Sequence, residues 1–357
     1  MSPSWAASQP LFPPPKRGEF SRPAMYEEFF HLSKAPFSMT PDPEFLFLAP
    51  THREALAGLI FTVLGRRGTA VLTGEVGTGK TTLLRKLIQS VPDEKVQFCS
   101  VFSTNVHPEE FFELILIGFG LPVAGAGKAQ RLLEFWEFLM DCDQEGRTPV
   151  LLVDEAHKLS AELLEEVRLL MNFETSERKL LQVVLAGQNE LRDLMRREDL
   201  RQLRQRVSVR LDIVPLQPAE VEQYMRHRWH RGGGNGNFPF RPEAVDLVAT
   251  WSRGIPRVMN AICDISLLRA YTSEAASIGL ETVREAVGAL ELMQPTPEPE
   301  EPRMAMDAPA IPSWEVLRLR EPGAIQAMPL RRAITSQEIA PRQPCWNGVW
   351  PARRKKR

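Results

Sequence analysis

The sequence lacks an apolar run long enough to cross a membrane. The longest candidate, residues 114–123, contains two glycines and is much shorter than the roughly 20 apolar residues that a transmembrane helix needs. The N-terminus is rich in proline and carries no apolar core of the secretory type. We therefore expect a cytoplasmic protein without a transmembrane segment, which reaches a membrane only through a partner.

Cysteine and net charge are also scarce. The four cysteines, Cys99, Cys142, Cys263 and Cys345, are too far apart for the spacings of metal sites, and they do not suggest a disulfide framework. Small buried thiols in a reducing compartment explain them better. The formal net charge at pH 7 is −1, so attraction to nucleic acid would need a local basic patch.

Proline is concentrated at the two ends of the chain. Residues 1–24 contain six of the 30 prolines and residues 293–357 contain eleven, and neither segment shows sustained periodicity. We expect a disordered extension and a disordered tail. Met25 opens the first patterned segment and is an alternative start to Met1. The five basic residues 353–357 are explained either as a solvated end or as a contact with an anionic polymer.

Short β-rich runs alternate with helical patterns in the first part of the remaining chain. The expected strands are 70–73, 96–102, 150–153, 181–186 and 207–213, and the expected helices are 80–90, 108–118, 130–142 and 161–172. This alternation is typical of a parallel sheet with helices on both faces. The sequence therefore predicts an α/β domain over residues 25–215.

The pattern becomes helical only after residue 216. The expected helices are 218–231, 241–252, 256–272 and 280–292. Glycine-rich residues 232–236 and the Gly254-Ile255-Pro256 turn separate some of them. The sequence predicts a small helical domain over residues 216–292.

Residues 74–81 match the phosphate-loop pattern G-x-x-x-x-G-K-[ST] between an expected strand and an expected helix. Glycines let backbone N–H groups converge on phosphate oxygens, and the helix N-terminus favours anions. Lys80 supplies a positive charge at the β- and γ-phosphates, and the Thr81 hydroxyl can ligate Mg²⁺. The residues predicted to bind ATP here are Gly74, Glu75, Val76, Gly77, Thr78, Gly79, Lys80, Thr81 and Thr82.

A second apolar run, residues 150–153, ends in Asp154 and Glu155. Chemistry in parallel-sheet enzymes lies at the carboxyl ends of strands. Asp154 can hold Mg²⁺, and Glu155 can orient and polarise the attacking water. A strand followed by an acidic helix cap is the alternative, and the phosphate loop favours the catalytic interpretation. We interpret His157 as a residue behind the site or on the surface.

Two further places, one after the fourth expected strand and one at the start of an expected lid helix, contain candidate residues. After the run 181–186, Gln188 or, failing it, Asn189 could contact the γ-phosphate or the water; a plain turn with a helix cap is the alternative. Arg257, one residue after a helix-starting proline, could lie over the bound nucleotide.

Seven arginines fall within residues 192–210. A guanidinium offered to the γ-phosphate of a neighbouring subunit would stabilise charge in the transition state, and Arg204 and Arg206 are the best candidates. The alternative is a solvated helix face paired with Glu198 and Asp199, which explains most of the seven.

Taken together, these motifs resemble the ExeA-type AAA+ ATPases. That family includes general secretion pathway protein A, its pilus-biogenesis relatives and ATPases of exosortase gene clusters. The matching segments, in order, are 26–30, 36–37, 40–43, 52–56, 74–82, 154–156, 185–191, 205–206 and 254–257. The resemblance covers about residues 25–292.

The resemblance implies a five-stranded parallel sheet in the order 5-1-4-3-2, a helical lid, assembly into a ring or dimer, and the site roles given above. It implies an ATPase that drives or regulates assembly of a secretion or envelope machine through a protein partner. Secretion members often continue into a transmembrane helix and a peptidoglycan-binding domain, whereas this chain continues into a proline-rich tail. The family pattern usually has proline where Asn189 stands.

Two other functions stay open. The same clade is similar to transposition regulators of the TniB and TnsC type, which bind DNA and ATP. A nucleotide switch that binds ATP without hydrolysing it is the third hypothesis.

Overall fold

The computed structural model describes residues 26–101, 106–123, 127–234, 236 and 238–291, which all lie within one unit, Met1–Pro297. The predicted extension and the whole predicted tail, including Cys345, lie outside the described residues. The other three cysteines, Cys99, Cys142 and Cys263, are free and buried. No helix among the described residues is long and apolar enough to cross a membrane.

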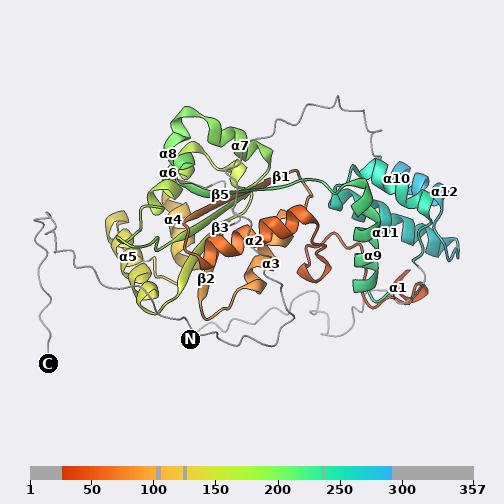
Figure 1. Ribbon diagram of the computed structural model, residues 1–357, viewed down its shortest axis with the longest axis horizontal. Helices are drawn as coiled ribbons and strands as arrows, with labels where there is room; N and C mark the ends of the chain where they lie inside the picture. The colour runs from red at the N-terminus through yellow and green to blue at the C-terminus, as the bar shows by residue number, and fades with distance from the viewer. Residues whose placement is uncertain (1–25, 102–105, 124–126, 235, 237, 292–357) are drawn as a thin grey trace, which may run out of the picture. The chain divides into compact units, whose positions relative to one another are not determined.

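Five parallel strands form one sheet in the order β2-β3-β4-β1-β5 (Figure 1). Read from the other edge this is 5-1-4-3-2, so the predicted order is confirmed. The strands are β1 (Thr69–Gly74), β2 (Val96–Val101), β3 (Thr148–Val153), β4 (Gln182–Gly187) and β5 (Val207–Ile213). This order places the carboxyl ends of β3, β4 and β1 next to one another in the middle of the sheet.

The two faces of the sheet pack into two different cores. Ala70 and Leu72 of β1 belong to one core and Val71 to the other, because successive strand side chains point to opposite faces. One face packs on α2 (Pro50–Leu64) and α3 (Lys80–Ser90). The other packs on α4 (Pro108–Gly118), α5 (Lys128–Gln144), α6 (Ala161–Leu170) and α7 (Asn189–Arg196).

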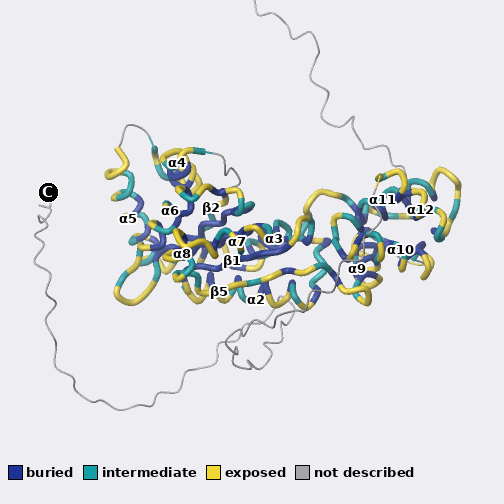
Figure 2. The backbone as a smooth tube through the Cα atoms, turned by 90° about the horizontal axis from the view of Figure 1, so that it is seen from above, coloured by how far each residue is buried: buried dark blue, intermediate teal, exposed yellow. Residues whose placement is uncertain are grey.

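Burial explains why the strands were readable in the sequence. Every residue of β1, β3 and β4 is buried, whereas the edge strands β2 and β5 contain exposed positions (Figure 2). Central strands of a sheet that is covered on both faces need continuous apolar runs. These strands extend one or two residues beyond some of the predicted ends.

Helix α2 was missed in the sequence. Ala55, Leu59 and Val63 form its buried stripe, yet Phe61 and Leu64 are about half exposed, at 49 % and 48 %. Apolar residues on the exposed side blur the helical period. Among the predicted helices, α3 and α4 have the expected bounds, α5 is longer and α6 is shorter. The short elements α1 (Tyr26–Phe29), α8 (Arg201–Gln205) and the 3₁₀ turns at 43–45, 156–158 and 198–200 were also not predicted.

A third core lies among the helices α9 (Pro218–Arg231), α10 (Pro242–Ser252), α11 (Pro256–Thr272) and α12 (Leu280–Ala289). We call these four helices the lid. Tyr26, Phe37 and Ala49 from the N-terminal segment also belong to this core, and Arg228 Nε donates to Pro36 O at 2.6 Å. The segment that precedes α2 therefore packs on the lid. The domain division at residues 215 and 216 stays a prediction, and it did not include this contact.

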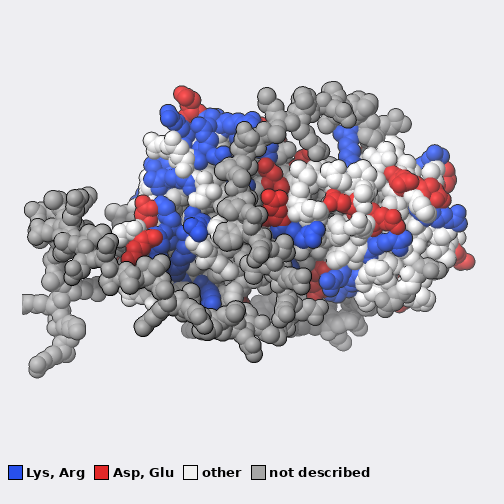
Figure 3. Space-filling model, in the orientation of Figure 1, with Lys and Arg blue, Asp and Glu red and all other residues white. Residues whose placement is uncertain are grey.

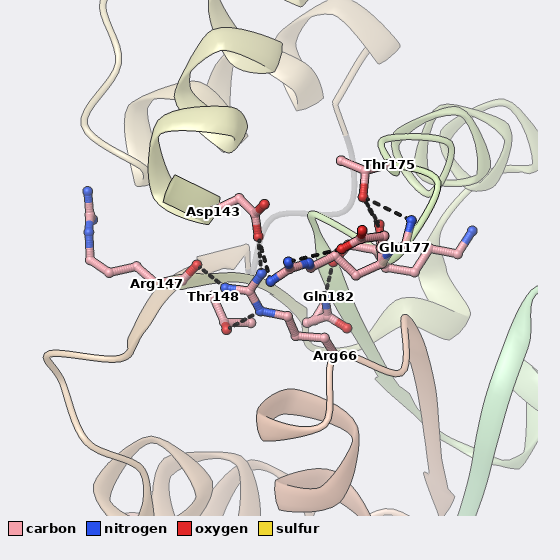
Figure 4. A network of polar contacts seen from close by, with 9 residues as sticks. Arg66, Asp143, Arg147, Thr148, Thr175, Glu177 and Gln182 are labelled. Atoms are coloured by element: carbon pink, nitrogen blue, oxygen red, sulfur yellow. Dashed lines mark hydrogen bonds and ion pairs between the residues drawn. The ribbon is translucent and has the colours of Figure 1, made fainter. Parts of the chain in front are cut away.

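A polar network joins several elements at the edge where the strands begin (Figure 4). Arg66, which follows α2 with a positive φ of 48°, donates to Thr148 Oγ1 at 3.1 Å and to Arg147 O at 2.7 Å. It also pairs with Asp143 of α5. The side chains of Arg66 and Asp143 are 16 % and 17 % exposed. One guanidinium thus ties α2 to α5 and to the start of β3.

We expect Asp143→Ala to lower the free energy of unfolding by about 1–3 kcal/mol, because it leaves a largely buried guanidinium without its carboxylate, although Arg66 keeps its bonds to Thr148 and Arg147. Urea denaturation would measure the change. Arg178→Ala is the matched control: Arg178 lies 3.5 Å from the same carboxylate but is 46 % exposed, so its loss should cost well under 1 kcal/mol. Equal effects of the two variants would contradict the importance of the Arg66 pair.

Candidate functional site

The loop between β1 and α3 has the backbone that phosphate binding requires. Gly77 and Gly79 have φ values of 81° and 102°, in the left-handed region that favours glycine. A Cβ on Gly77 would also lie 2.7 Å from Arg257 Cβ. The glycines therefore allow the loop to turn sharply and let a lid side chain approach it closely.

Lys80 is the first residue of α3, and its side chain is held against the loop. Its Nζ donates to Gly74 O at 2.8 Å and to Glu75 O at 2.7 Å, and the residue is 6 % exposed. Burial lowers the pKa of the ammonium, while the Glu155 and Asp154 carboxylates oppose that shift. A cation in this position attracts anionic groups because it is poorly compensated by water.

Thr81 and Asp154 meet, although they are 73 residues apart in the sequence. Thr81 Oγ1 donates to Asp154 Oδ2 at 2.7 Å, and Glu155 N donates to Asp154 Oδ1 at 2.9 Å. Asp154 is 4 % exposed. A hydroxyl beside a carboxylate is an oxygen donor set that suits Mg²⁺. No cluster of three or more His, Cys, Asp or Glu that could hold a metal occurs among the described residues, so an ion here would need phosphate or water oxygens as well.

Glu155 follows Asp154 in a left-handed conformation with φ 55°. Its carboxylate lies 3.0 Å from Lys158 Nζ and 3.7 Å from His157 Nε2. Burial raises its pKa, but the hydrogen bond and charge of Lys158, with His157 and Lys80, outweigh this and lower the pKa overall. The carboxylate is therefore ionised at neutral pH, as a group that accepts a proton from water must be.

Gln188 follows β4, which lies between β1 and β3 as the predicted order requires. Gln188 is half-buried, its backbone N–H donates to His157 Nδ1 at 3.3 Å, and it lines the same cavity as Glu155. His157, with its side chain 10 % exposed, thus lies behind the site between Glu155 and Gln188. Asn189 is exposed at the first position of α7.

Arg257 comes to the phosphate loop from the lid. Its backbone N donates to Gly77 O at 3.2 Å, and it lines the cavity from the start of α11. Proline at the first position of α11, Pro256, suits a helix start because its missing N–H would have no partner there.

A cavity of about 330 Å³ joins these groups. The phosphate loop, Glu155 and Gln188 line one part of it, and lid residues line another. The third wall is the N-terminal segment, including Phe45 and Phe47. The sequence therefore predicted the part of the cavity around the phosphate loop. The structure adds the part that is lined by the lid and by the N-terminal segment.

Several cavity residues had no predicted role, and four of them are His52, Tyr224, Arg228 and Asn260. His52 Nε2 lies 2.9 Å from Thr78 O, and burial lowers the pKa of this imidazole. Tyr224, Arg228 and Asn260 line the cavity from the lid. His52 stands in a segment that carried the family resemblance, whereas no sequence signal marked the other three, because they meet only through packing of α9 on α11.

Arg204 and Arg206 do not line the cavity of their own chain. Arg204 Nη1 donates to Arg196 O at 3.0 Å, at the C-terminal end of α7, and Arg206 is half-buried after α8. Figure 3 shows Lys and Arg gathered over α7 and α8, and three of these arginines pair with acids: Arg192, Arg196 and Arg197. Any action of Arg204 or Arg206 on nucleotide would need a second copy.

Known proteins are similar to this chain in sequence and in fold. A family described as an AAA domain matches residues 64–195. The chain is 40 % identical over 248 residues to "General secretion pathway protein A" from Aeromonas hydrophila; the match covers 69 % of this chain and 45 % of that relative. The chain thus spans less than half the length of this relative.

Solved structures agree on the fold alone. Cdc6p from Pyrobaculum aerophilum is 19 % identical with a TM-score of 0.56, and the match covers 71 % of this chain and 72 % of that one. The ORC2 protein of Aeropyrum pernix, solved in ADPNP–ADP complexes, is 18 % identical with a TM-score of 0.54, over 67 % and 68 % of the two chains. The chain thus contains an AAA domain with the AAA+ fold, and its sequence is similar to general secretion pathway protein A.

Proposed function

We propose that this protein binds ATP with Mg²⁺ in the cavity, hydrolyses it at an interface between two copies, and uses the cycle to drive or regulate assembly of a secretion or envelope machine. The observation that carries the proposal is the Thr81–Asp154 hydrogen bond, which joins the phosphate loop to the acidic pair beside Lys80. The secretion role rests on the similarity to general secretion pathway protein A. A cytoplasmic location with a protein partner is part of the same proposal.

Each residue has a defined task in this proposal. The loop amides and Lys80 would bind the β- and γ-phosphates, and Thr81 with Asp154 would hold Mg²⁺, which neutralises charge on phosphate oxygens when bound. Glu155 would leave Lys158 to accept the proton of the attacking water, and Gln188 would orient that water. Arg257 would couple nucleotide binding to the lid, because this lid residue contacts the phosphate loop and lines the cavity.

Calorimetric titration with ATP and Mg²⁺, followed by phosphate release at increasing protein concentration, tests the proposal. We expect saturable binding and a specific activity that rises with concentration. Binding without turnover at any concentration would favour a switch that does not hydrolyse ATP. Turnover stimulated by DNA, with steep loss of that stimulation in salt, would favour a transposition regulator.

A mixing experiment tests the arginines. Arg206→Ala and Lys80→Ala should each be nearly inactive alone, and a mixture should recover part of the activity, because some interfaces would combine an intact Arg206 with an intact Lys80. Arg204→Ala should behave similarly if Arg204 is the acting residue, and Arg201→Ala, an exposed neighbour, is the control. Activity that is independent of concentration and is not rescued by mixing would leave both arginines with a surface role.

A further inference from the structure

A chain of hydrogen bonds between two lid helices lines the cavity. Arg228 Nη1 donates to Tyr224 OH at 3.4 Å, and Tyr224 OH donates to Asn260 Oδ1 at 2.7 Å. Arg228 and Tyr224 lie on α9 and Asn260 on α11, and the three residues are 8 %, 4 % and 7 % exposed. Polar side chains that are buried to this extent are usually hydrogen-bonded, and these three are bonded to one another.

The hydrogen bonds run in one direction, from Arg228 through Tyr224 to Asn260. Arginine can only donate, so the oxygen of Tyr224 is the acceptor of the first bond. The Tyr224 hydroxyl donates in turn to Asn260 Oδ1, so the amino group of Asn260 points away from Tyr224. The amino group of Asn260, Nδ2, has no hydrogen-bond acceptor among the residues that the structure describes. The network therefore leaves one oriented N–H donor group at the cavity wall.

The position of Asn260 indicates which part of a nucleotide it would meet. It follows Arg257 by three residues, hence by about 4.5 Å along α11, and Arg257 N is bonded to Gly77 O of the phosphate loop. Beyond the loop, the cavity is lined by Phe45, Leu46, Phe47 and Leu216. Apolar walls with few polar groups suit a flat heterocyclic base.

Arg228 holds part of this wall in place. Its Nε donates to Pro36 O at 2.6 Å and its Nη2 to Ser38 O at 3.3 Å, and its guanidinium lies 5.1 Å from the centroid of the Phe45 ring. One buried cation thus fixes both the apolar wall and the hydroxyl that orients Asn260.

We propose that Asn260 Nδ2 donates a hydrogen bond to a ring nitrogen of the purine of the bound nucleotide, with Tyr224 as the positioning residue that orients the amide. The inference rests on the proposed function, since it assigns a ligand contact within the ATP site. It adds a recognition element that no phosphate-loop motif contains.

Base analogues test the contact directly. Calorimetric titration of the full chain would compare ADP with 1-deaza-, 3-deaza- and 7-deaza-ADP, each of which lacks one ring nitrogen, and with 2′-deoxy-ADP. In the unmodified protein, we expect one of the three deaza analogues to bind about 2- to 12-fold more weakly than ADP, the range of one neutral hydrogen bond. In Asn260→Ala that difference should disappear, because the donor is gone.

Two more variants separate recognition from folding. Asn260→Asp keeps the shape and the acceptor for Tyr224 but removes the donor, so it should lose the same discrimination as Asn260→Ala. Tyr224→Phe should weaken the discrimination because the amide loses its fixed orientation, whereas Tyr271→Phe, on an exposed residue of α11, should leave it unchanged.

The outcomes are distinguishable. Deaza penalties that are equal in the unmodified protein and in both Asn260 variants would overturn the base contact. A penalty that couples Asn260 to 2′-deoxy-ADP alone would overturn it as well and assign the amide to the ribose. If the unmodified protein does not bind ADP or ATP at all, the proposed function itself fails.

Discussion

Glu155→Gln is expected to reduce turnover of ATP by about 10²- to 10⁴-fold, the usual contribution of a general base. The amide keeps the shape of the side chain but cannot accept a proton from water. The carboxylate that it replaces is ionised at neutral pH, since Lys158 and His157 lower its pKa. Nucleotide affinity should stay within about threefold, because Lys80, Thr81 and Asp154 are unchanged. Phosphate release and calorimetric titration measure the two quantities.

Glu162→Gln is the control for this variant. Glu162 is exposed in the first turn of α6, carries the same chemical change, and does not line the cavity. It should retain the activity of the unmodified protein. Full turnover in Glu155→Gln would remove Glu155 from the mechanism and leave its contact with Lys158 as an ordinary surface ion pair.

Lys80→Ala is expected to weaken ATP binding by about 10- to 150-fold, since hydrogen bonds to charged groups contribute about 1.5–3 kcal/mol. The buried ammonium is bonded only to two loop carbonyls among the described residues, so it can exchange these neutral acceptors for phosphate oxygens. The variant should also lose hydrolysis, because the β- and γ-phosphates lose their nearest cation. Titration with a fluorescent ATP analogue measures the loss.

Lys86→Ala controls for the removal of one positive charge from the same helix. Lys86 is half-buried on α3 but does not line the cavity. It should bind ATP as the unmodified protein does, and both variants should melt cooperatively. Wild-type affinity in Lys80→Ala would argue that nucleotide does not occupy the phosphate loop.

Local chemistry made half of the site readable from the sequence. Gly77, Gly79 and Lys80 lie within four consecutive residues, and their spacing between a strand and a helix specifies a phosphate loop at the start of that helix. Asp154 and Glu155 end a continuous apolar run, which is typical of a strand buried on both faces. The hydrogen bond between Thr81 and Asp154 places the two predicted Mg²⁺ ligands side by side.

The other half was not readable, because no local pattern encodes it. Asn260 stands in an ordinary helical stretch, and Tyr224 in another, 36 residues earlier. Each looks like a core or surface residue until α9 packs on α11. The N-terminal segment is similar: Phe37 was noted only as part of a family resemblance, and in the lid core its ring packs against Phe240, which is far away in the sequence.

The sequence by itself determined the strands, most of the longer helices, the phosphate loop and the acidic pair, because these depend on period, turn chemistry and adjacent residues. Only the tertiary structure decided that the N-terminal segment packs on the lid, that His157 lies between Glu155 and Gln188, and that Asn260 has an unused donor. Those features arise from side chains far apart in the chain. Their hydrogen bonds and burial exist only once the lid helices, the sheet and the N-terminal segment have packed together.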